Sequence, residues 1–471
     1  MTSLHALAQA ALPGVNDPSL LDQAARAGLA ERGGYLPARF SGNIPICPPE
    51  TRPILPESAA NLLKRMLTGE HQDLLPELLE RAAAGGFVLP PETLPAMLET
   101  KETALRSLLL PVLGERGRWL AAQNPAWDWA LPREPRQAWE TGTRAQRLAA
   151  LKTIRAERPA EARAWMQEEW QRDSPEERAT FLSAFAIGLS PDDEPFLEAC
   201  LDDRRKEVRE AAQMLLLRLP RSRLMERMWA RAQPLVRADP TLQVTLPEEA
   251  DSAARRDGLD DAPLRKWMGA GANRLARLLA CVPPSRWSQA LRRSPGALLS
   301  LAMESEWREP LLVGWALAAC RTQDADWAAA VLQQAAASVN LRNLLEAETL
   351  QSLAMLLAPE RMQAIVETAF AQRVQDDASP LWEILQQYAR PWTPALAWRV
   401  IQEMQRQAHE PRSRLPHLLP FFARRIPPEM SAELSAGWPE HTSALWQTKI
   451  DEFLQILSFR NRIWHSLENT P

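Results

Sequence analysis

Proline recurs along this chain, and several prolines stand directly after a serine or threonine that opens a helical pattern. The chain has 40 prolines in 471 residues. In Ser174-Pro175-Glu176-Glu177 the serine can accept a hydrogen bond from a free helix amide, proline fits the first turn, and a carboxylate stands at the third position. Ser190-Pro191-Asp192-Asp193 repeats the arrangement, and Ser379-Pro380 and Thr393-Pro394 begin in the same way. These starts predict a succession of short helices.

The segments between these starts carry apolar residues at helical spacing. The stripes are Leu182, Phe185, Ala186 and Leu189; Val208, Ala212, Leu215 and Leu219; and a longer run from Trp446 to Trp464. Each helix is expected to have about three to four turns and one apolar face, which it must bury against neighbouring helices. We therefore predict an all-α protein, a HEAT/armadillo-like α-solenoid whose repeat period is imperfect.

Changes in composition divide the predicted array into four segments. Residues 1–57 are an N-terminal segment that ends in a proline-rich strap at 41–57, where a continuous helix is impossible. Residues 58–238 form the N-terminal HEAT-like helical block, and residues 264–471 form the C-terminal helical-repeat block. Between them, residues 239–263 are rich in acids and break the helical pattern. This segment is predicted to be an acidic linker or loop.

The sequence contains no recognisable catalytic or metal-binding motif. It has no GxxxxGK[ST] phosphate loop, no HExxH and no GxSxG. Cys47, Cys200, Cys281 and Cys320 are far apart in the sequence, whereas a structural metal site needs clustered ligands. We therefore expect free buried thiols. We expect neither a cofactor nor a metal, and no enzyme of a recognisable class.

The N-terminus and the hydropathy favour a cytoplasmic protein. The first residues, MTSLHALAQAALPGVNDPSLL, have no cationic region before the short Ala/Leu stretch, which makes them a poor secretory signal. No window approaches the roughly 18–20 apolar residues that cross a bilayer. We therefore expect a cytoplasmic protein that is not inserted in a membrane.

A basic region stands out in a chain of net charge −4 and pI near 6.0. Residues 204–237 hold ten basic residues and three acids, and Arg204, Arg205 and Arg209 open this region. One interpretation is a ladder of ion pairs between repeats, together with a solvated face. The other is a basic groove that takes an acidic protein segment or a phosphate backbone. The sequence leaves both open, and these three arginines are candidate partner-binding residues.

The tryptophans supply a second candidate. The chain has 18 tryptophans and 2 tyrosines, and most of the tryptophans stand at helical spacing typical of packing between helices. Trp127-Asp128-Trp129 instead follows Asn124-Pro125, in a predicted connection between helices. Indoles that flank a carboxylate can stack on a base or on a peptide side chain. Trp127 and Trp129 are therefore also candidate partner-binding residues.

Residues 190–224 resemble the second half of a HEAT repeat. Leu201-Asp202-Asp203 marks a tight turn, and the next helix opens with a Val208-Arg209 pair. Three longer phrases resemble a bacterial family of uncharacterised helical-repeat proteins: Arg116 to Trp127; Gly188 to Glu198 with Asp202-Asp203-Arg204; and Leu278 to Trp287. Members of that family tend to be encoded beside MoxR-type AAA ATPases, von Willebrand A-domain proteins and SWIM zinc-finger proteins. The resemblance implies a partner of this class and no catalytic residues.

Together these observations predict a non-catalytic scaffold or adaptor for protein–protein interaction. By the family resemblance, the expected partner is a MoxR-type AAA ATPase or a von Willebrand A-domain protein. The alternative is a nucleic-acid-binding HEAT-like protein, including a DNA glycosylase, since such glycosylases pair aromatic residues with an aspartate on a basic face. The acidic pI weighs against this alternative.

Overall fold

The computed structural model describes Gly28 and residues 45–131, 134–219, 221–260, 262–372, 379–410 and 413–468. The chain divides into two compact units, residues 1–49 and residues 50–471. Most of the predicted N-terminal segment 1–57 lies outside the described residues. The part of the proline-rich strap that is described, from Pro45 onward, contains no helix before Glu57.

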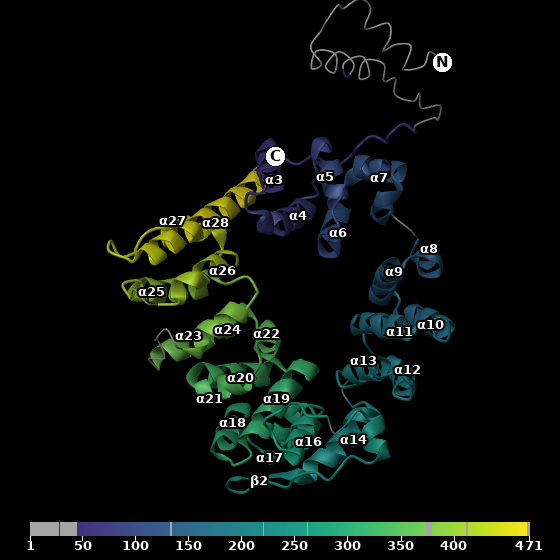
Figure 1. Cartoon of the computed structure of the whole chain (residues 1–471), viewed down its shortest axis with the longest axis vertical. Coiled ribbons are helices and arrows are strands. Elements are labelled where there is room, and N and C mark those ends of the chain that lie inside the picture. The colour runs from purple at the N-terminus through teal and green to yellow at the C-terminus, as the bar shows by residue number, and fades with distance from the viewer. Residues whose placement is uncertain are drawn as a thin grey trace, which may run out of the picture. The chain divides into compact units, whose positions relative to one another are not determined.

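Residues 50–471 form an all-α unit (Figure 1). Its first half contains the helices α3 (Glu57–Leu67), α4 (Leu75–Ala84), α5 (Leu94–Leu98), α6 (Thr103–Leu109), α7 (Gly114–Gln123), α8 (Pro135–Thr141), α9 (Arg144–Glu157), α10 (Pro159–Glu169), α11 (Pro175–Leu182), α12 (Glu194–Cys200), α13 (Lys206–Leu216) and α14 (Arg223–Ala232). Short 3₁₀ turns, written η, join several of them.

The second half continues in the same way. Its helices are α15 (Ser252–Arg256), α16 (Ala270–Leu279), α17 (Pro284–Leu291), α18 (Pro295–Glu304), α19 (Arg308–Thr322), α20 (Ala325–Ala337), α21 (Val339–Leu344), α22 (Ala347–Met355), α23 (Pro359–Ala371), α24 (Pro380–Gln387), α25 (Pro394–Gln407), α26 (Leu419–Ala423), α27 (Ser431–Leu434) and α28 (Ala444–Glu468). In the described residues the strands are β1 (Val236–Ala238) and β2 (Leu242–Val244), an antiparallel pair.

The predicted helix starts are confirmed. Ser174 caps α11: its hydroxyl accepts from the Glu177 amide at 3.3 Å, and the Glu177 carboxylate accepts from the Ser174 amide at 3.0 Å. At the 3₁₀ turn η6 (Pro191–Asp193), the Asp193 carboxylate accepts from the Ser190 amide at 3.1 Å, and the Asp193 amide donates to the Ser190 carbonyl at 3.0 Å. Ser379 and Thr393 cap α24 and α25. In each case the side chain or its neighbour satisfies an amide that the helix leaves free.

Two predicted stripes differ in detail from the structure. The stripe from Leu182 to Leu189 was expected to be one helix, but α11 ends at Leu182 and a 3₁₀ turn, η5 (Ser183–Ala186), follows. Leu182 and Phe185 are buried nonetheless. The C-terminal stripe belongs to α28, which has 25 residues and is longer than expected. Its buried face is long because several elements pack along it in turn.

Residues 239–263, the predicted acidic linker or loop, contain the strand β2 and the helix α15. Strand β1 pairs with β2 through Val236 and Val244, Arg237 and Gln243, and Ala238 and Leu242. Asp251 caps α15 by accepting from the Ala254 amide at 2.6 Å. The segment thus carries regular structure, and Asp257, directly after α15, is buried.

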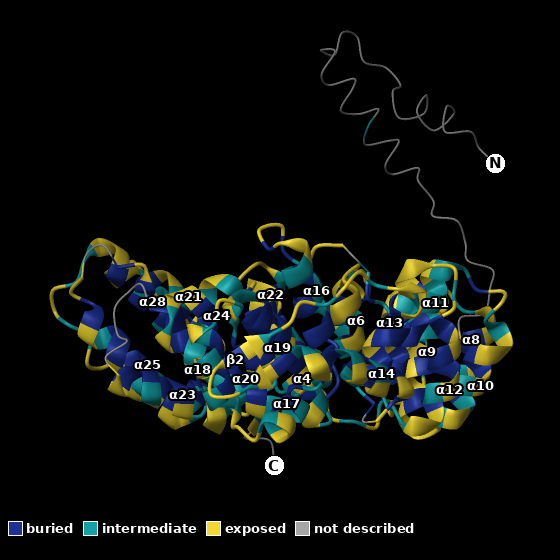
Figure 2. Cartoon of the chain, turned by 90° about the horizontal axis from the view of Figure 1, so that it is seen from below, coloured by how far each residue is buried: buried dark blue, intermediate teal, exposed yellow. Residues whose placement is uncertain are grey.

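Most helices pack on helices near them in the sequence. The contacting pairs include α8 with α9, α12 with α13, α16 with α19, α18 with α20, and α23 with α25. The main exception is α28, which packs on α3 and α4 as well as on α26 and α27. The two ends of residues 50–471 are therefore in contact. One cluster of buried side chains runs from Leu55 to Ile463, visible as dark blue in Figure 2.

Candidate functional site

Arg204 and Arg205 stand at the start of α13. Both are exposed, and Arg205 is the N-cap residue, whose amide donates to the Asp203 carboxylate at 2.9 Å. Within the described ranges neither guanidinium has a hydrogen-bond or ion-pair partner. These two side chains therefore place positive charge on the surface without a local counter-ion.

Arg209 has a different place, one turn further along α13. It is half-buried, and its guanidinium donates to the backbone carbonyls of Asp203 at 2.8 Å and Arg204 at 3.0 Å. Asp203 also lies 3.4 Å from the guanidinium of Arg178 on α11. Arg209 thus fixes the turn between α12 and α13 and positions Arg204 and Arg205, and its charge is already engaged with backbone oxygens.

Trp127 and Trp129 lie in η4 (Pro125–Ala130), which packs on α7. Both indoles are half-buried and pack against the core. The indole N–H of Trp127 donates to Glu99 at 3.3 Å, and the Arg106 guanidinium lies 4.9 Å from the Trp129 ring centre. The structure does not bring this pair together with the Arg204 region, because α7 and α13 lie in separate parts of the array (Figure 1).

The middle of the basic region joins an ion-pair network around Asp257. Arg227 on α14 donates to this carboxylate at 2.7 Å and reaches Glu198 at 3.1 Å, and Arg231 donates to Asp257 at 2.7 Å. Burial alone would raise the pKa of Asp257, but the hydrogen bonds from Arg227 and Arg231 outweigh it and hold that pKa below its usual range. Glu198 and Asp257 come from outside the basic region.

The basic residues of 204–237 differ in whether their charge is paired. Lys206, Arg223, Arg227 and Arg231 pair with acids, and Arg209 and Arg218 bond to neutral oxygens. In the part of the chain that the structure describes, the Arg204, Arg205 and Arg237 side chains make no hydrogen bond or ion pair, and the charge of Arg221 helps to lower the pKa of Glu226. Ion pairs thus engage Lys206, Arg223, Arg227 and Arg231, and the charges of Arg204, Arg205 and Arg237 remain exposed without such a pair.

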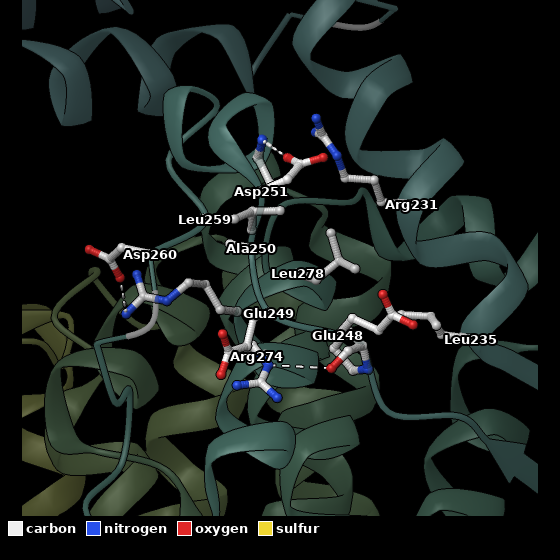
Figure 3. A pocket seen from close by; sticks show the side chains of 13 residues that line it. Arg231, Leu235, Glu248, Glu249, Ala250, Asp251, Leu259, Asp260, Arg274 and Leu278 are labelled. Atoms are coloured by element: carbon white, nitrogen blue, oxygen red, sulfur yellow. Dashed lines mark hydrogen bonds and ion pairs between the residues drawn. The ribbon is translucent and has the colours of Figure 1, made fainter.

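A cavity of about 260 Å³ adjoins this network. Arg231 lines it from α14, Arg274 and Arg277 from α16, and Glu248 and Glu249 from the segment after β2. Leu259, Ala250 and Leu278 lie between the charged side chains (Figure 3). The sequence analysis missed this cavity because its acids fall in the predicted linker. The high density of acidic residues in 239–263 was the sequence signal that could have indicated a charged site there.

The cysteines are placed as single thiols. Cys200 and Cys281 are buried, and Cys47 and Cys320 are half-buried. Burial raises the pKa of the Cys200 and Cys320 thiols to about 12, so both are protonated near neutral pH. Among the described residues no group of His, Cys, Asp and Glu has the arrangement to hold a metal ion.

The fold and this site define an all-α protein with exposed arginines at the start of α13 and an ion-pair network around Asp257. The chain belongs to DUF5691, a family of unknown function whose model matches residues 2–467. Comparisons with curated proteins and with solved structures gave no match. Of the helices that the structure describes, none combines the length and apolarity needed to span a bilayer.

Proposed function

We propose that this protein is a non-catalytic helical-repeat scaffold that holds a protein partner, and that its helices are a degenerate HEAT-like α-solenoid in two blocks. The observation that carries the proposal is the packing of most helices on near neighbours in the sequence, α12 on α13 and α23 on α25 among them. Arrays of this kind present long, rigid surfaces to partners.

The exposed start of α13 is the proposed contact point. Arg204 and Arg205 carry charge that no described acid neutralises, and Arg209 holds the backbone beneath them. A partner with an acidic surface fits this chemistry, because complementary charge steers association and fixes orientation. The resemblance stated above makes a MoxR-type AAA ATPase or a von Willebrand A-domain protein the proposed partner.

The test is a pull-down from the native host with nuclease treatment, analysed by mass spectrometry. We expect wild type to retain an AAA ATPase or a von Willebrand A-domain protein, and R204E/R205E to lose most of it. The matched control is R292E/R293E, which reverses another exposed adjacent pair after α17. Equal recovery by both double variants would contradict the proposed contact point.

The same experiment addresses nucleic acid as the partner. Binding through phosphates would be lost on nuclease treatment and would weaken steeply with salt. In that outcome the scaffold proposal fails, and Asp128, between the two indoles, becomes the first residue to substitute.

A further inference from the structure

A second, larger cavity lies where the two ends of residues 50–471 meet. Its volume is about 730 Å³. Its walls come from η1 (Gln72–Leu74) and α4, from residues 391–394 at the start of α25, from residues 424–429 after α26, and from α28. Pockets of a few hundred cubic ångströms that are mostly apolar, with a few convergent polar groups, are typical of small-molecule sites.

Most charged side chains of this cavity have partners. Arg460 donates to Glu77 at 2.7 and 2.9 Å, and Arg424 donates to Asp73 at 2.6 Å. Arg81 lies 3.8 Å from the centre of the Trp464 ring and 3.4 Å from Glu468. The two further acids that line the cavity, Glu80 and Glu429, are exposed, so water screens their charge.

Arg425 is the exception. It is half-buried, and its guanidinium donates only to the backbone carbonyls of Phe421 at 3.1 Å and Gln386 at 3.4 Å. Burial lowers the pKa of Arg425, and the neighbouring charge of Arg424 lowers it further. Within the described ranges no carboxylate pairs with it. A guanidinium withdrawn from water without a counter-ion is costly, and an anion would relieve that cost.

Trp392, which lines the same cavity, has an unsatisfied donor. Trp392 is 4% exposed, and its indole N–H has no hydrogen-bond partner among the described residues. The two residues are held together, since the Trp392 amide donates to the Arg425 carbonyl at 2.8 Å and its ring lies 4.8 Å from that of Phe422. Within the described residues, the cavity is thus lined by a guanidinium that lacks a counter-ion and by a tryptophan whose buried N–H lacks an acceptor.

We propose that this cavity binds a small organic molecule through an oxyanion, a carboxylate or a phosphate, that pairs with the Arg425 guanidinium. The planar fork of arginine matches both anions in two-point contacts. Pro391, Pro394 and Trp464 provide apolar surface for the rest of the ligand. The ligand would touch α4 and α28 together, and so would strengthen the contact between the two ends of this unit.

The test is calorimetric titration of the full chain with phenyl phosphate and with benzoate, at constant ionic strength set by chloride. The two probes share a ring, so their comparison identifies the preferred anion. We expect wild type to bind at least one probe saturably. R425Q should bind that probe at least roughly tenfold more weakly than wild type, because a charge-assisted pair is lost. R425K, which keeps the charge without the fork, should bind with intermediate affinity. R462Q removes an exposed arginine of α28 that does not line the cavity and should bind as wild type does.

Hydrogen exchange of the wild-type chain locates the site independently of any variant. The probe that binds should slow amide exchange in α4 and in residues 391–394 and 424–429. Absence of saturable binding by both probes would overturn the proposal. Protection confined to other segments, or equal affinity of R425Q and wild type, would overturn it as well.

Discussion

At the scale of single residues, a buried ion pair between an arginine and an aspartate joins α9 to η6. Arg155 on α9 and Asp193 in η6 are both fully buried, with two contacts of 3.0 and 2.9 Å. Arg163 adds a third at 2.7 Å, and Arg155 also donates to four backbone carbonyls. Every buried donor of this pair is thus used, which is the condition under which a buried ion pair is tolerated.

The Asp257 network predicts a pH-dependent stability. The folded-state pKa of Asp257 lies below the unfolded value of about 3.9. Its contribution to the free energy of unfolding is therefore complete above that value and is lost as the pH falls through the folded-state pKa. D257N should therefore lower the free energy of unfolding by about 2 kcal/mol at neutral pH, because Arg227 and Arg231 lose a charged partner while both stay partly exposed to water.

Urea unfolding at a series of pH values measures this difference. The difference should shrink as the pH drops below about 4 towards the folded-state pKa of Asp257, because protonated Asp257 is uncharged, like the asparagine of the variant. D239N, which removes an exposed acid beside strand β1, should match wild type throughout. A wild-type advantage that stays constant over the acid range would show that the charge of Asp257 is not its source.

At the scale of elements, the caps set where helices begin. The Ser174 hydroxyl accepts from the amide of Glu177, and the Ser174 amide donates to the Glu177 carboxylate. S174A should lower the free energy of unfolding by about 1 kcal/mol, since the Glu177 amide loses its acceptor, whereas S174D, which keeps an acceptor, should be nearly neutral. Thermal or urea unfolding of the three proteins decides this. Equal losses for both variants would mean that the hydroxyl is not the stabilising group.

Local signals of this kind explain how much of the fold the sequence predicted. The caps at Ser174 and Thr393 depend on residues within three positions, so their helices could be located without a structure. The turn after Leu182 carries the Phe185 and Gly188 carbonyls that accept from the Arg155 guanidinium, so its conformation belongs with the buried pair of Arg155 and Asp193. That pair joins residues 38 positions apart, beyond the reach of helical periodicity.

The candidate sites divide in the same way. Arg204 and Arg205 were found from charge density, and both are exposed. The cavity at Arg425 gave no sequence signal, because its walls come from α4 and from elements after residue 390. Local patterns identify what each helix carries, and only packing shows which helices meet.

At the scale of the whole unit, Glu77 joins the first helices to the last one. Its carboxylate accepts from Arg460 at 2.7 and 2.9 Å and from the Trp464 indole at 2.8 Å, across 383 and 387 positions of sequence. Arg460 also donates to the carbonyls of Ala423 at 2.7 Å and Ile426 at 2.6 Å. One guanidinium therefore ties α4, α28 and the segment after α26 together.

Removal of the Glu77 carboxylate should loosen this contact before it unfolds the rest of the molecule. E77A leaves Arg460, which is 6% exposed, without its counter-ion, and this should cost the contact about 2 kcal/mol. Hydrogen exchange limited by local opening should then be roughly thirtyfold faster in α4 and in the last turns of α28. E80A, which removes an exposed acid from the same helix, should exchange as wild type does. If E77A accelerated exchange evenly along the chain, the contact between α4 and α28 would be part of one global unfolding step, and neither end could open by itself.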